Sequence, residues 1–592
     1  MVGSFTTSKG PPDVKRRSVP TLAAGTAAVL ALGIAAATAV PLGFTQDRSA
    51  DLAKQIDPSK PKSVILLIGD GMDDSMITAA RNYSVGASGR LALDEMPFSG
   101  AMTTYGLKVG TGPKYPIAYV SDSAPTASGW STGKKTVDGR LSQGPSTAEN
   151  VPGEDYATVL EKFKAAGKLT GNVSTAEITD ATPAAAASHI NARDCQDPTA
   201  MAKCPTARKS VGGLGSVAEQ LVDTKVDVLL GGGSARYDKP LEDGSESVLS
   251  YAKSKKGYRS VATATELGGI SSLAGGPVLG LFSPSHMTRK YAKLTAVAGG
   301  ASTADGKCVP QDRGTQPTLQ AMTDKAIALL DNPNGFFLQV EGASVDKAEH
   351  DQDICGAIGE LEDLDLAVKS ALAYQSKHPD TLVIVTGDHA HSTQIVPDAN
   401  AGRQTATVTT VDGNPMTVAY STAAAGSSAS HTGAQIRVAA IGPQAANVTG
   451  VIDQTDLFAT MLGRTPSTLP TSGPTVTVTA SPTQSPTASP TTSPTATPTT
   501  QPTTQPTGKP VARLAAPKAL RRGERAWIAV AASDASSVKV VVVQGRTRVT
   551  RKLASRGGSV RLPALSRGSA RIKVVVKGDG GTTRITRTIT VR

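Results

Sequence analysis

Apolar runs that end abruptly in polar residues predict the central strands of this chain. One run extends from Ser63 to Gly69 and another from Ile384 to Gly387, and an acidic residue follows each of them, Asp70 and Asp388. A third apolar run leads into Glu341. Open α/β sheets place their active residues at strand ends in this way. The pattern therefore predicts an α/β domain with a central, mostly parallel sheet flanked by helices.

The last part of the chain, residues 511–592, has a different pattern. Its apolar runs are rich in β-branched residues, often alternate with polar ones, and are separated by Gly and Asp turns. This spacing predicts a small antiparallel β sandwich, immunoglobulin-like in the broad sense. The expected strands cover residues 526–530, 538–543, 546–551, 570–576 and 583–591.

Composition divides the rest of the chain. Near the N-terminus, Lys15, Arg16 and Arg17 precede an alanine-rich apolar run, and small residues offer a cleavage point before Val40, as in a signal peptide. We therefore expect a secreted protein, with the choice between general and twin-arginine export left open. A Thr-, Pro- and Ser-rich stretch predicts a semi-rigid tether that buries no core. The predicted segments are a signal peptide (1–39), an α/β domain (40–462), a linker (463–510) and a basic β-sandwich domain (511–592).

Positive charge is concentrated in the tail. The chain has a net charge of +12, whereas residues 511–592 contain 19 Lys plus Arg against 3 Asp plus Glu, a net +16 that leaves about −4 for the remainder. Such charges either keep sheet edges from aggregating or attach the protein to an anionic surface, for example a phosphate-rich cell-wall polymer. No nucleic-acid motif or aromatic stacking platform accompanies them, so we expect no specific nucleic-acid binding.

Imidazole is concentrated where carboxylates also lie. Of seven histidines, His350, His389 and His391 lie close together in the sequence, and His431 follows. Asp346 is four residues before His350, so on a helix both side chains share one face and can bind one ion. Carboxylate with imidazole suits zinc. His391 is equally compatible with a metal ligand and with a supporting residue. The other histidines are interpreted as ordinary helix or loop residues: His189, His286 and His378.

The segment around Ser123 indicates a nucleophile. Asp122-Ser123-Ala124-Pro125 is typical of a helix start, where Ser or Asp caps free backbone N–H groups and Pro is tolerated. A hydroxyl at a helix N-terminus lies in a field that favours anions. Two cations near such a group are a known device for displacement at phosphorus. Ser123 is therefore a candidate to attack a phosphoryl group, with an arginine completing the site.

These motifs together resemble the bacterial metal-dependent alkaline phosphatases. The resemblance extends from about Lys62 to Leu462, with all motifs in family order. Departures from the family pattern include Asp73, which adds negative charge beside the expected metals, Pro125 and Gly387. The motifs that carry the resemblance are Gly69-Asp70-Gly71-Met72, Asp122-Ser123-Ala124, residues 171–183, residues 341–347, Asp388-His389-Ala390-His391 and His431-Thr432-Gly433.

The resemblance implies a role for each of these positions. Ser123 would become phosphoserine, Arg193 would clamp two phosphate oxygens with Asp122 orienting it, and Lys347 would pair with Asp180, as in the magnesium-type bacterial members. Two zinc ions and one magnesium ion are implied, held respectively by Asp346, His350 and His431; by Asp70, Asp388 and His389; and by Asp70, Thr182 and Glu341, with Asp180 behind the magnesium's water ligands.

The implied activity is hydrolysis of small phosphate monoesters. The four cysteines match family disulfides, Cys195 with Cys204 and Cys308 with Cys355, which agrees with export. Rival interpretations are a phosphodiesterase or sulfatase relative, and a wall-binding protein whose enzyme-like domain has lost activity. The natural substrate and the oligomeric state, homodimer or monomer, stay open. Specificity is expected in the loops at 233–304 and 396–430.

Overall fold

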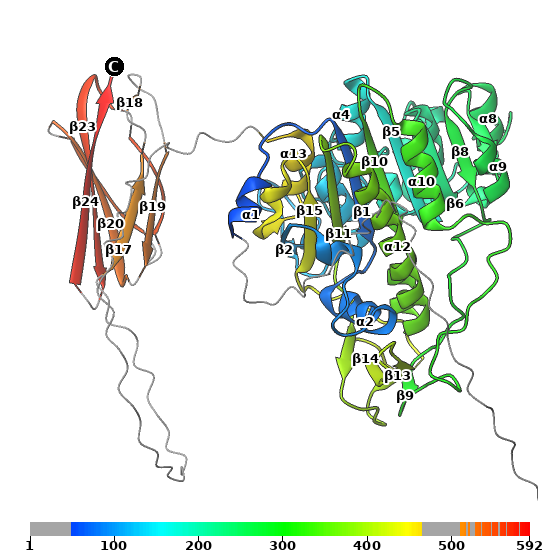
Figure 1. The fold of residues 1–592 in the computed structure, drawn as a ribbon. Helices are drawn as coiled ribbons and strands as arrows, with labels where there is room; N and C mark the ends of the chain where they lie inside the picture. Colours follow the sequence, from blue (N-terminus) through cyan, green and yellow to red (C-terminus); the bar gives the residue numbers. More distant parts are fainter. Residues whose placement is uncertain are drawn as a thin grey trace, which may run out of the picture. The chain divides into compact units, whose positions relative to one another are not determined.

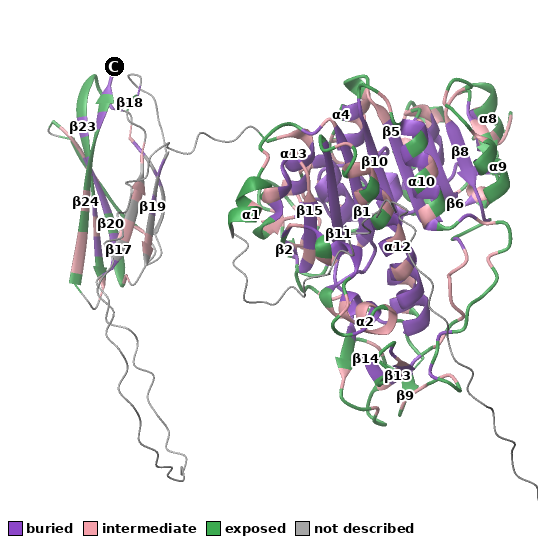
Figure 2. Ribbon diagram, viewed as in Figure 1, coloured by how far each residue is buried: buried purple, intermediate pink, exposed green. Residues whose placement is uncertain are grey.

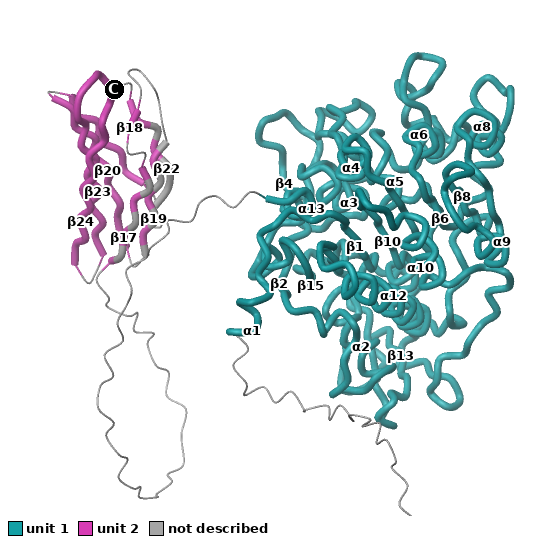
Figure 3. Tube along the Cα trace, turned by 45° about the horizontal axis from the view of Figure 1, so that its top comes forward, with its two compact units in different colours: residues 1–473 teal, residues 474–592 magenta. Residues whose placement is uncertain are grey.

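The computed structural model of the chain describes residues 49–464, except residue 425, and most of residues 510–592. The predicted signal peptide and nearly all of the predicted linker lie outside the described residues. The chain divides into two compact units, residues 1–473 and 474–592 (Figure 3). Each unit is described here by itself, and the predicted domain limits stay predictions. In the second unit the undescribed residues are 474–509, 517–518, 521–526, 534, 546, 554–556, 564 and 579–580.

A ten-stranded sheet forms the centre of the first unit (Figure 1). All neighbouring strands are parallel except the two pairs that involve β15. The strand order is β16 (Gly450–Asp453), β2 (Phe98–Thr103), β15 (Ile436–Ile441), β11 (Thr381–Gly387), β1 (Ser63–Gly69), β10 (Phe336–Gly342), β5 (Leu169–Glu177), β6 (Val228–Gly232), β8 (Val278–Leu281) and β7 (Arg259–Val261).

Helices cover both faces of this sheet, so the central strands are buried throughout (Figure 2). On one face Ile65 and Leu67 pack with residues of α10 (Leu319–Leu330) and α12 (Ile354–Gln375). On the other face Leu66 packs with residues of α3 (Ser123–Thr132), α4 (Val159–Ala165) and α13 (Asp456–Leu462). Burial on both faces explains the continuous apolar runs of the sequence. The predicted α/β fold is confirmed.

Shorter elements surround this core. A four-stranded antiparallel sheet has the order β12 (Thr393–Val396), β14 (Pro415–Tyr420), β13 (Gln404–Thr409) and β9 (Val297–Ala298), and β3 (Gly106–Leu107) pairs with β4 (Ile117–Ala118). The other α-helices are α1 (Ser49–Lys54), α2 (Asp74–Ser84), α5 (Ala181–Ala185), α6 (Val217–Asp223), α7 (Ser234–Tyr237), α8 (Val248–Ser254), α9 (Ala264–Gly269) and α11 (Ser344–His350). Short 3₁₀ turns occupy Ala92–Glu95, Met201–Lys203, Pro205–Ala207, Lys209–Val211 and Ala445–Val448.

Two disulfides fasten the first unit, and both join the cysteines that the resemblance pairs. Cys195 is bonded to Cys204 and Cys308 to Cys355. Among the helices of the described residues, none combines the length and apolar character needed to cross a membrane.

The second unit is a β sandwich, which confirms that part of the predicted fold. One layer contains β17 (Val511–Ala515), β19 (Trp527–Ser533) and β22 (Gly557–Arg561). The other layer has the order β18 (Ala519–Leu520), β24 (Gly581–Val591), β23 (Gly568–Gly578), β20 (Ser537–Gln544) and β21 (Thr547–Leu553). Five strands match the predicted runs, whereas β17, β18 and β22 were not predicted. One pair departs from the expected antiparallel pattern, because β18 is parallel to β24.

Candidate active site

Four adjacent strands of the central sheet end at the same edge and deliver the predicted ligands there. In the order β11, β1, β10 and β5 these strands are parallel neighbours, so their carboxyl ends lie side by side. Asp388 follows β11 and Asp70 follows β1. Glu341 is the last residue but one of β10, and Asp180 and Thr182 lie just beyond β5. Residues far apart in the sequence therefore meet, as the motifs predict.

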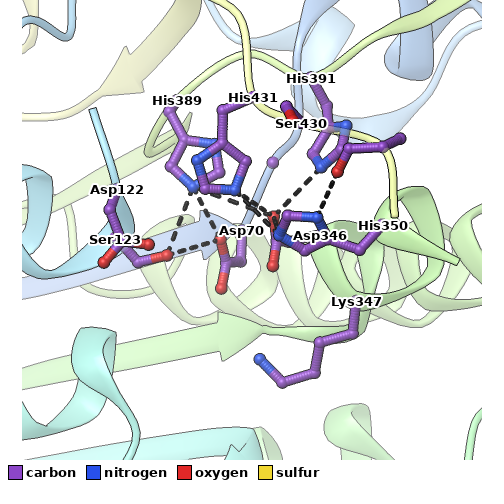
Figure 4. Close-up of polar contacts among 12 residues, drawn as sticks. Asp70, Asp122, Ser123, Asp346, Lys347, His350, His389, His391, Ser430 and His431 are labelled. Atoms are coloured by element: carbon purple, nitrogen blue, oxygen red, sulfur yellow. Dashed lines mark hydrogen bonds and ion pairs between the residues drawn. The ribbon is translucent and has the colours of Figure 1, made fainter. Parts of the chain in front are cut away.

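Ser123 is the first residue of α3, at the N-terminus of a ten-residue helix. Its Oγ donates to Oδ1 of Asp70 at 3.3 Å and lies 3.3 Å from Nε2 of His389 (Figure 4). Asp122 has the N-cap position, but its side chain does not cap the helix. Its Oδ2 instead accepts from Nη1 of Arg193 at 2.7 Å. The capping that the helix-start pattern left open between Ser and Asp is therefore not made by Asp122, whose carboxylate holds the arginine, as the resemblance implies.

Asp346, His350 and His431 bring three ligand atoms together. Nδ1 of His350 donates to the carbonyl of Ala429 at 2.6 Å, and Nδ1 of His431 donates to the carbonyl of Ser121 at 3.1 Å. Both Nε2 atoms are then unprotonated in the neutral rings, yet they lie only 3.1 Å apart. Oδ1 of Asp346 is 3.4 Å and 3.1 Å from them. Three electron pairs facing one another at these distances repel unless a cation lies among them.

The acid–base behaviour of this group supports the same conclusion. Burial alone would lower the pKa of His431, but the hydrogen bond and charge of Asp346 raise it to about 9 when only protons compete for the site. The arrangement thus attracts positive charge. A neutral imidazole with its other nitrogen donating to a backbone carbonyl is the usual form of a metal-binding histidine. The donor set of one carboxylate and two imidazoles fits zinc.

His391 lies beside this group but differs in its protonation. It is 1% exposed, and burial lowers its pKa to about 2, so the ring is neutral. Nδ1 accepts from the backbone N–H of Ser392 at 3.1 Å, which leaves the proton on Nε2. That Nε2 faces Oδ1 of Asp346 at 3.5 Å. Because a protonated nitrogen cannot bind a metal, this tautomer makes His391 a neighbour of the Asp346 carboxylate rather than a ligand, a choice that was open from the sequence, although its Nε2 forms no hydrogen bond in the described structure.

Asp70, Asp388 and His389 form a second group at the edge. Oδ1 of Asp388 accepts from the backbone N–H groups of Gly71 at 2.8 Å and His389 at 2.7 Å. Nε2 of His389 lies 3.3 Å from Oδ2 of Asp388 and 3.5 Å from Oδ1 of Asp70. Burial, with the negative charges of Asp388 and Asp346, raises the pKa of Asp70 well above its usual value. A second cation would relieve this repulsion.

The third predicted set is built of oxygen atoms. Glu341 accepts a hydrogen bond from the hydroxyl of Ser174, and burial raises its pKa to about 8 although Lys347 opposes the shift. Oγ1 of Thr182 is buried and has no hydrogen-bond partner in the described structure. Carboxylate and hydroxyl oxygens suit magnesium. A buried hydroxyl without a partner beside a carboxylate with a raised pKa fits a site that binds a cation.

Asp180 is held between two cations. Its Oδ1 accepts from Nη2 of Arg193 at 2.5 Å, and its Oδ2 lies 2.9 Å from Nζ of Lys347. Burial alone would raise the pKa of Asp180, but Lys347 and Arg193 outweigh burial and lower it. Asp122 and Asp180 therefore hold the two terminal nitrogens of Arg193, while Asp180 also positions Lys347.

The sequence that builds this site also matches known proteins. The family model for alkaline phosphatase matches residues 61–418. The chain belongs to the alkaline phosphatase family. It is 45% identical to alkaline phosphatase of Escherichia coli (strain K12) over 428 residues, which cover 71% of this chain and 89% of that one. Alkaline phosphatase H of Pseudomonas aeruginosa is also 45% identical, covering 70% and 87%. These matches identify a phosphoric monoester hydrolase.

Other relatives extend this comparison. Streptomycin-6-phosphate phosphatase of Streptomyces griseus is 43% identical over 432 residues, covering 70% of this chain and 93% of that one. Among solved structures, alkaline phosphatase from the Antarctic bacterium TAB5 superposes with a TM-score of 0.51 at 22% identity, covering 68% of this chain and 98% of that one. This second likeness concerns the fold alone.

Asp73, the departure from the family pattern, has a structural position. Its Oδ1 accepts from the backbone N–H of Met76 at 2.9 Å as the N-cap of α2, and its Oδ2 accepts from the backbone N–H of His391 at 3.3 Å. Burial raises the pKa of Asp73 to about 6. The carboxylate thus links the start of α2 to the segment of His391. The contact of Asp73 with the backbone of His391 could not be predicted from the sequence, because the two residues are far apart in the chain.

The three remaining histidines lie outside the two metal-binding groups. Nε2 of His189 is 2.8 Å from Oε1 of Glu161. His378 stacks on Tyr374 with ring centroids 4.0 Å apart. Nδ1 of His286 accepts from the backbone N–H of Glu177 at 3.2 Å.

Proposed function

We propose that this alkaline phosphatase hydrolyses phosphate monoesters through a phosphoserine intermediate on Ser123, at a site with two zinc ions and one magnesium ion. One observation carries the proposal. The Ser123 hydroxyl lies 3.3 Å from both Asp70 Oδ1 and His389 Nε2, at the N-terminus of a helix. A nucleophile, metal-binding groups and an anion-favouring helix end therefore converge on one point.

The residues of the chain account for two successive displacements. In the first, Ser123 Oγ bonds to phosphorus and the ester oxygen leaves as the alcohol. In the second, water attacks the phosphoserine, and Oγ leaves with a proton while inorganic phosphate is released. The paired N–H groups of Arg193 suit two non-bridging phosphate oxygens, and Asp122 with Asp180 fixes the guanidinium plane. Metal ions in the site, when bound, lower the pKa of the hydroxyl and of water and stabilise the leaving oxygen.

The proposed allocation of metals follows the donor atoms. Asp346, His350 and His431 would hold one zinc, and Asp70, Asp388 and His389 the other. Glu341, Thr182 and Asp70 would hold magnesium.

Labelling of the nucleophile tests the mechanism. Wild-type protein incubated with a phosphate ester and quenched in acid should carry phosphate on Ser123, detected by mass spectrometry of the peptide. Ser123→Ala should lose the label and most of the activity and keep its zinc. Ser131→Ala is a matched control in the same helix, because that buried hydroxyl has no hydrogen-bond partner. Phosphate recovered on any other residue would refute the assignment.

The breadth of substrates is left between two alternatives. Relatives of nearly equal identity carry names of both kinds, alkaline phosphatase at 45% and Streptomycin-6-phosphate phosphatase at 43%. The enzyme thus acts either on many exposed phosphomonoesters or on one phosphorylated metabolite. The two disulfides and the predicted signal peptide support secretion, since disulfides persist in oxidising compartments. Finding the mature chain, cleaved before Val40, outside the cytoplasm would test this.

We also propose that the sandwich unit attaches the enzyme to an anionic cell-wall polymer. On the outer face of the five-stranded layer, Lys539 of β20 lies directly opposite Lys552 of β21. Like charges opposite one another destabilise a sheet, so the pairing has a cost that an anionic partner would offset. All described charged residues of this face are basic and exposed: Lys539, Arg548, Lys552, Arg571, Lys573, Lys577 and Arg584.

A further inference from the structure

A cavity adjoins the proposed phosphate clamp. Its volume is about 250 Å³, and Arg193 forms part of its wall together with Asp138, Glu149 and Lys203. The backbone N–H of Arg193 donates to the carbonyl of Gly139 at 2.6 Å, which fastens the turn that bears Asp138 to the arginine. Any phosphate ester held by Arg193 thus has this cavity beside it.

Some of the charged residues that line the cavity form salt bridges and others do not. Arg193 is paired with Asp122 and Asp180, and Nζ of Lys203 is 2.5 Å from Oδ2 of Asp194. In contrast, neither Asp138 nor Glu149 forms a salt bridge within the described part of the chain. Both carboxylates are exposed. Desolvation by the surrounding atoms and the neighbouring charge of Asp122 raise the pKa of Asp138, although His431 and Lys108 oppose the shift. The cavity therefore presents two carboxylates without a salt-bridge partner among the described residues, and the only positive charge of its wall that acts on Glu149 is that of Lys203, which is already paired with Asp194.

The walls of the cavity are held in place by contacts within the protein. Nδ2 of Asn191 donates to the carbonyl of Glu149 at 3.2 Å and to that of Lys203 at 3.0 Å, so it ties the two sides together. The buried guanidinium of Arg140 donates to the carbonyl of Val151 at 2.9 Å, next to the Glu149 side. The Cys195–Cys204 disulfide joins the residues that directly follow Asp194 and Lys203 of the wall. A preorganised cavity of this kind loses little entropy when a ligand enters.

We propose that this cavity receives the alcohol part of the substrate, and that Asp138 and Glu149 select alcohols that carry a positive charge. The inference rests on the proposed role of Arg193 as the phosphate clamp. The substrate class is then phosphate monoesters of cationic alcohols. These alcohols must be small, because the volume of the cavity lies just below that of pockets for drug-sized ligands. Neither loop in which specificity was expected, 233–304 or 396–430, lines this cavity.

A matched pair of substrates tests the effect of the positive charge on the alcohol alone. Phosphocholine and 3,3-dimethylbutyl phosphate have the same shape and differ in a quaternary nitrogen against a carbon. For the metal-loaded, full-length enzyme at low ionic strength, we expect kcat/KM for phosphocholine to exceed that for the neutral ester by about five-fold, as two partly exposed charge contacts allow. Added salt should reduce the ratio.

Variants assign the effect to the cavity. In Asp138→Asn/Glu149→Gln the ratio should fall to about one, because kcat/KM for phosphocholine should fall more than that for the neutral ester. Asp324→Asn removes one exposed carboxylate from α10, outside the cavity, and should keep the wild-type ratio. A wild-type ratio of one or less, or a ratio that the double variant leaves unchanged, would overturn the inference. If hydrolysis of both esters proceeds without phosphate on Ser123, the proposed function fails instead.

Discussion

The two units of this protein use charge in opposite ways. At the sheet edge of the first unit the charged groups are buried and in contact: Asp388 and His389 are 0% exposed, and Asp70 is 3% exposed. On the outer face of the sandwich, Lys539, Lys573 and their neighbours are exposed and without acidic partners among the described residues. Buried charges interact strongly and demand exact geometry, whereas exposed ones are screened by solvent and salt. A single substitution should therefore disable the first region but only weaken the second.

The largest effect is expected from a buried ligand. Asp346→Asn removes the charge that both His350 and His431 face, so zinc content should fall by about one ion per chain and turnover by at least about 100-fold. Zinc is measured by atomic spectroscopy and turnover with an aryl phosphate. Asp351→Asn, at the C-cap of the same helix and with a side chain that is 44% exposed, is the control and should retain both metals. Unchanged zinc in Asp346→Asn would contradict the ligand assignment.

How much of this site was predictable depends on what each residue contacts. Asp70, Glu341 and Asp388 lie at the ends of apolar strands that are parallel neighbours in the sheet. The local pattern and the family resemblance therefore predicted that they lie together. The role of His391 was not predictable, because it depends on one backbone hydrogen bond from Ser392 that fixes the tautomer. The local pattern at Asp122 indicates only a helix start, and its contact with the distant Arg193 was expected from the family resemblance alone.

Prediction of the fold from the sequence had similar limits. The long alternating runs of β20 and β23 were visible because each places an apolar side chain on the core at every second position. The run of β24 does so only at Ile585, Ile589 and Val591. The strand β18 has two residues and is defined only by its pairing with β24. The cavity beside Arg193 is likewise invisible in the sequence, because its walls come from four separate segments, three of which are tied by Asn191 and Arg140.

An intermediate effect is expected from the exposed face. Lys539→Glu/Lys573→Glu in the full-length protein should lower the fraction bound to isolated anionic cell walls several-fold, and turnover on a small soluble ester should stay unchanged. Wild-type binding should weaken steeply as added salt shortens the Debye length below about 10 Å. Substitution of Thr586, an uncharged residue opposite Lys573, by Ser is the control. Retention that depends on neither charge nor salt would exclude an electrostatic attachment.

The smallest effect is expected from a pair of intermediate exposure, His189 with Glu161, whose side chains are 11% and 29% exposed. Burial alone would lower the pKa of His189, but Glu161 raises it above 6.5, and the same contact lowers the pKa of Glu161 below 4.5. The stability from the raised histidine is present in full below pH 6.5 and is lost as the pH rises through its folded value. That from the lowered glutamate is present above pH 4.5 and is lost in acid. The pair should thus contribute most between about pH 4.5 and 6.5, by less than about 1 kcal/mol.

Thermal unfolding of wild-type protein and Glu161→Gln across pH 4 to 9, in the same metal buffer, would show this window. Glu161 also accepts from the N–H of Thr158 at 2.8 Å, and the amide oxygen of Gln can accept the same bond, so any loss of stability common to every pH should be small. Only the pH-dependent part reports the ion pair, and it should amount to about 1–2 °C in melting temperature. A difference that stays constant between pH 5.5 and 8.5 would show that even partly buried charges behave here like the exposed ones of the sandwich.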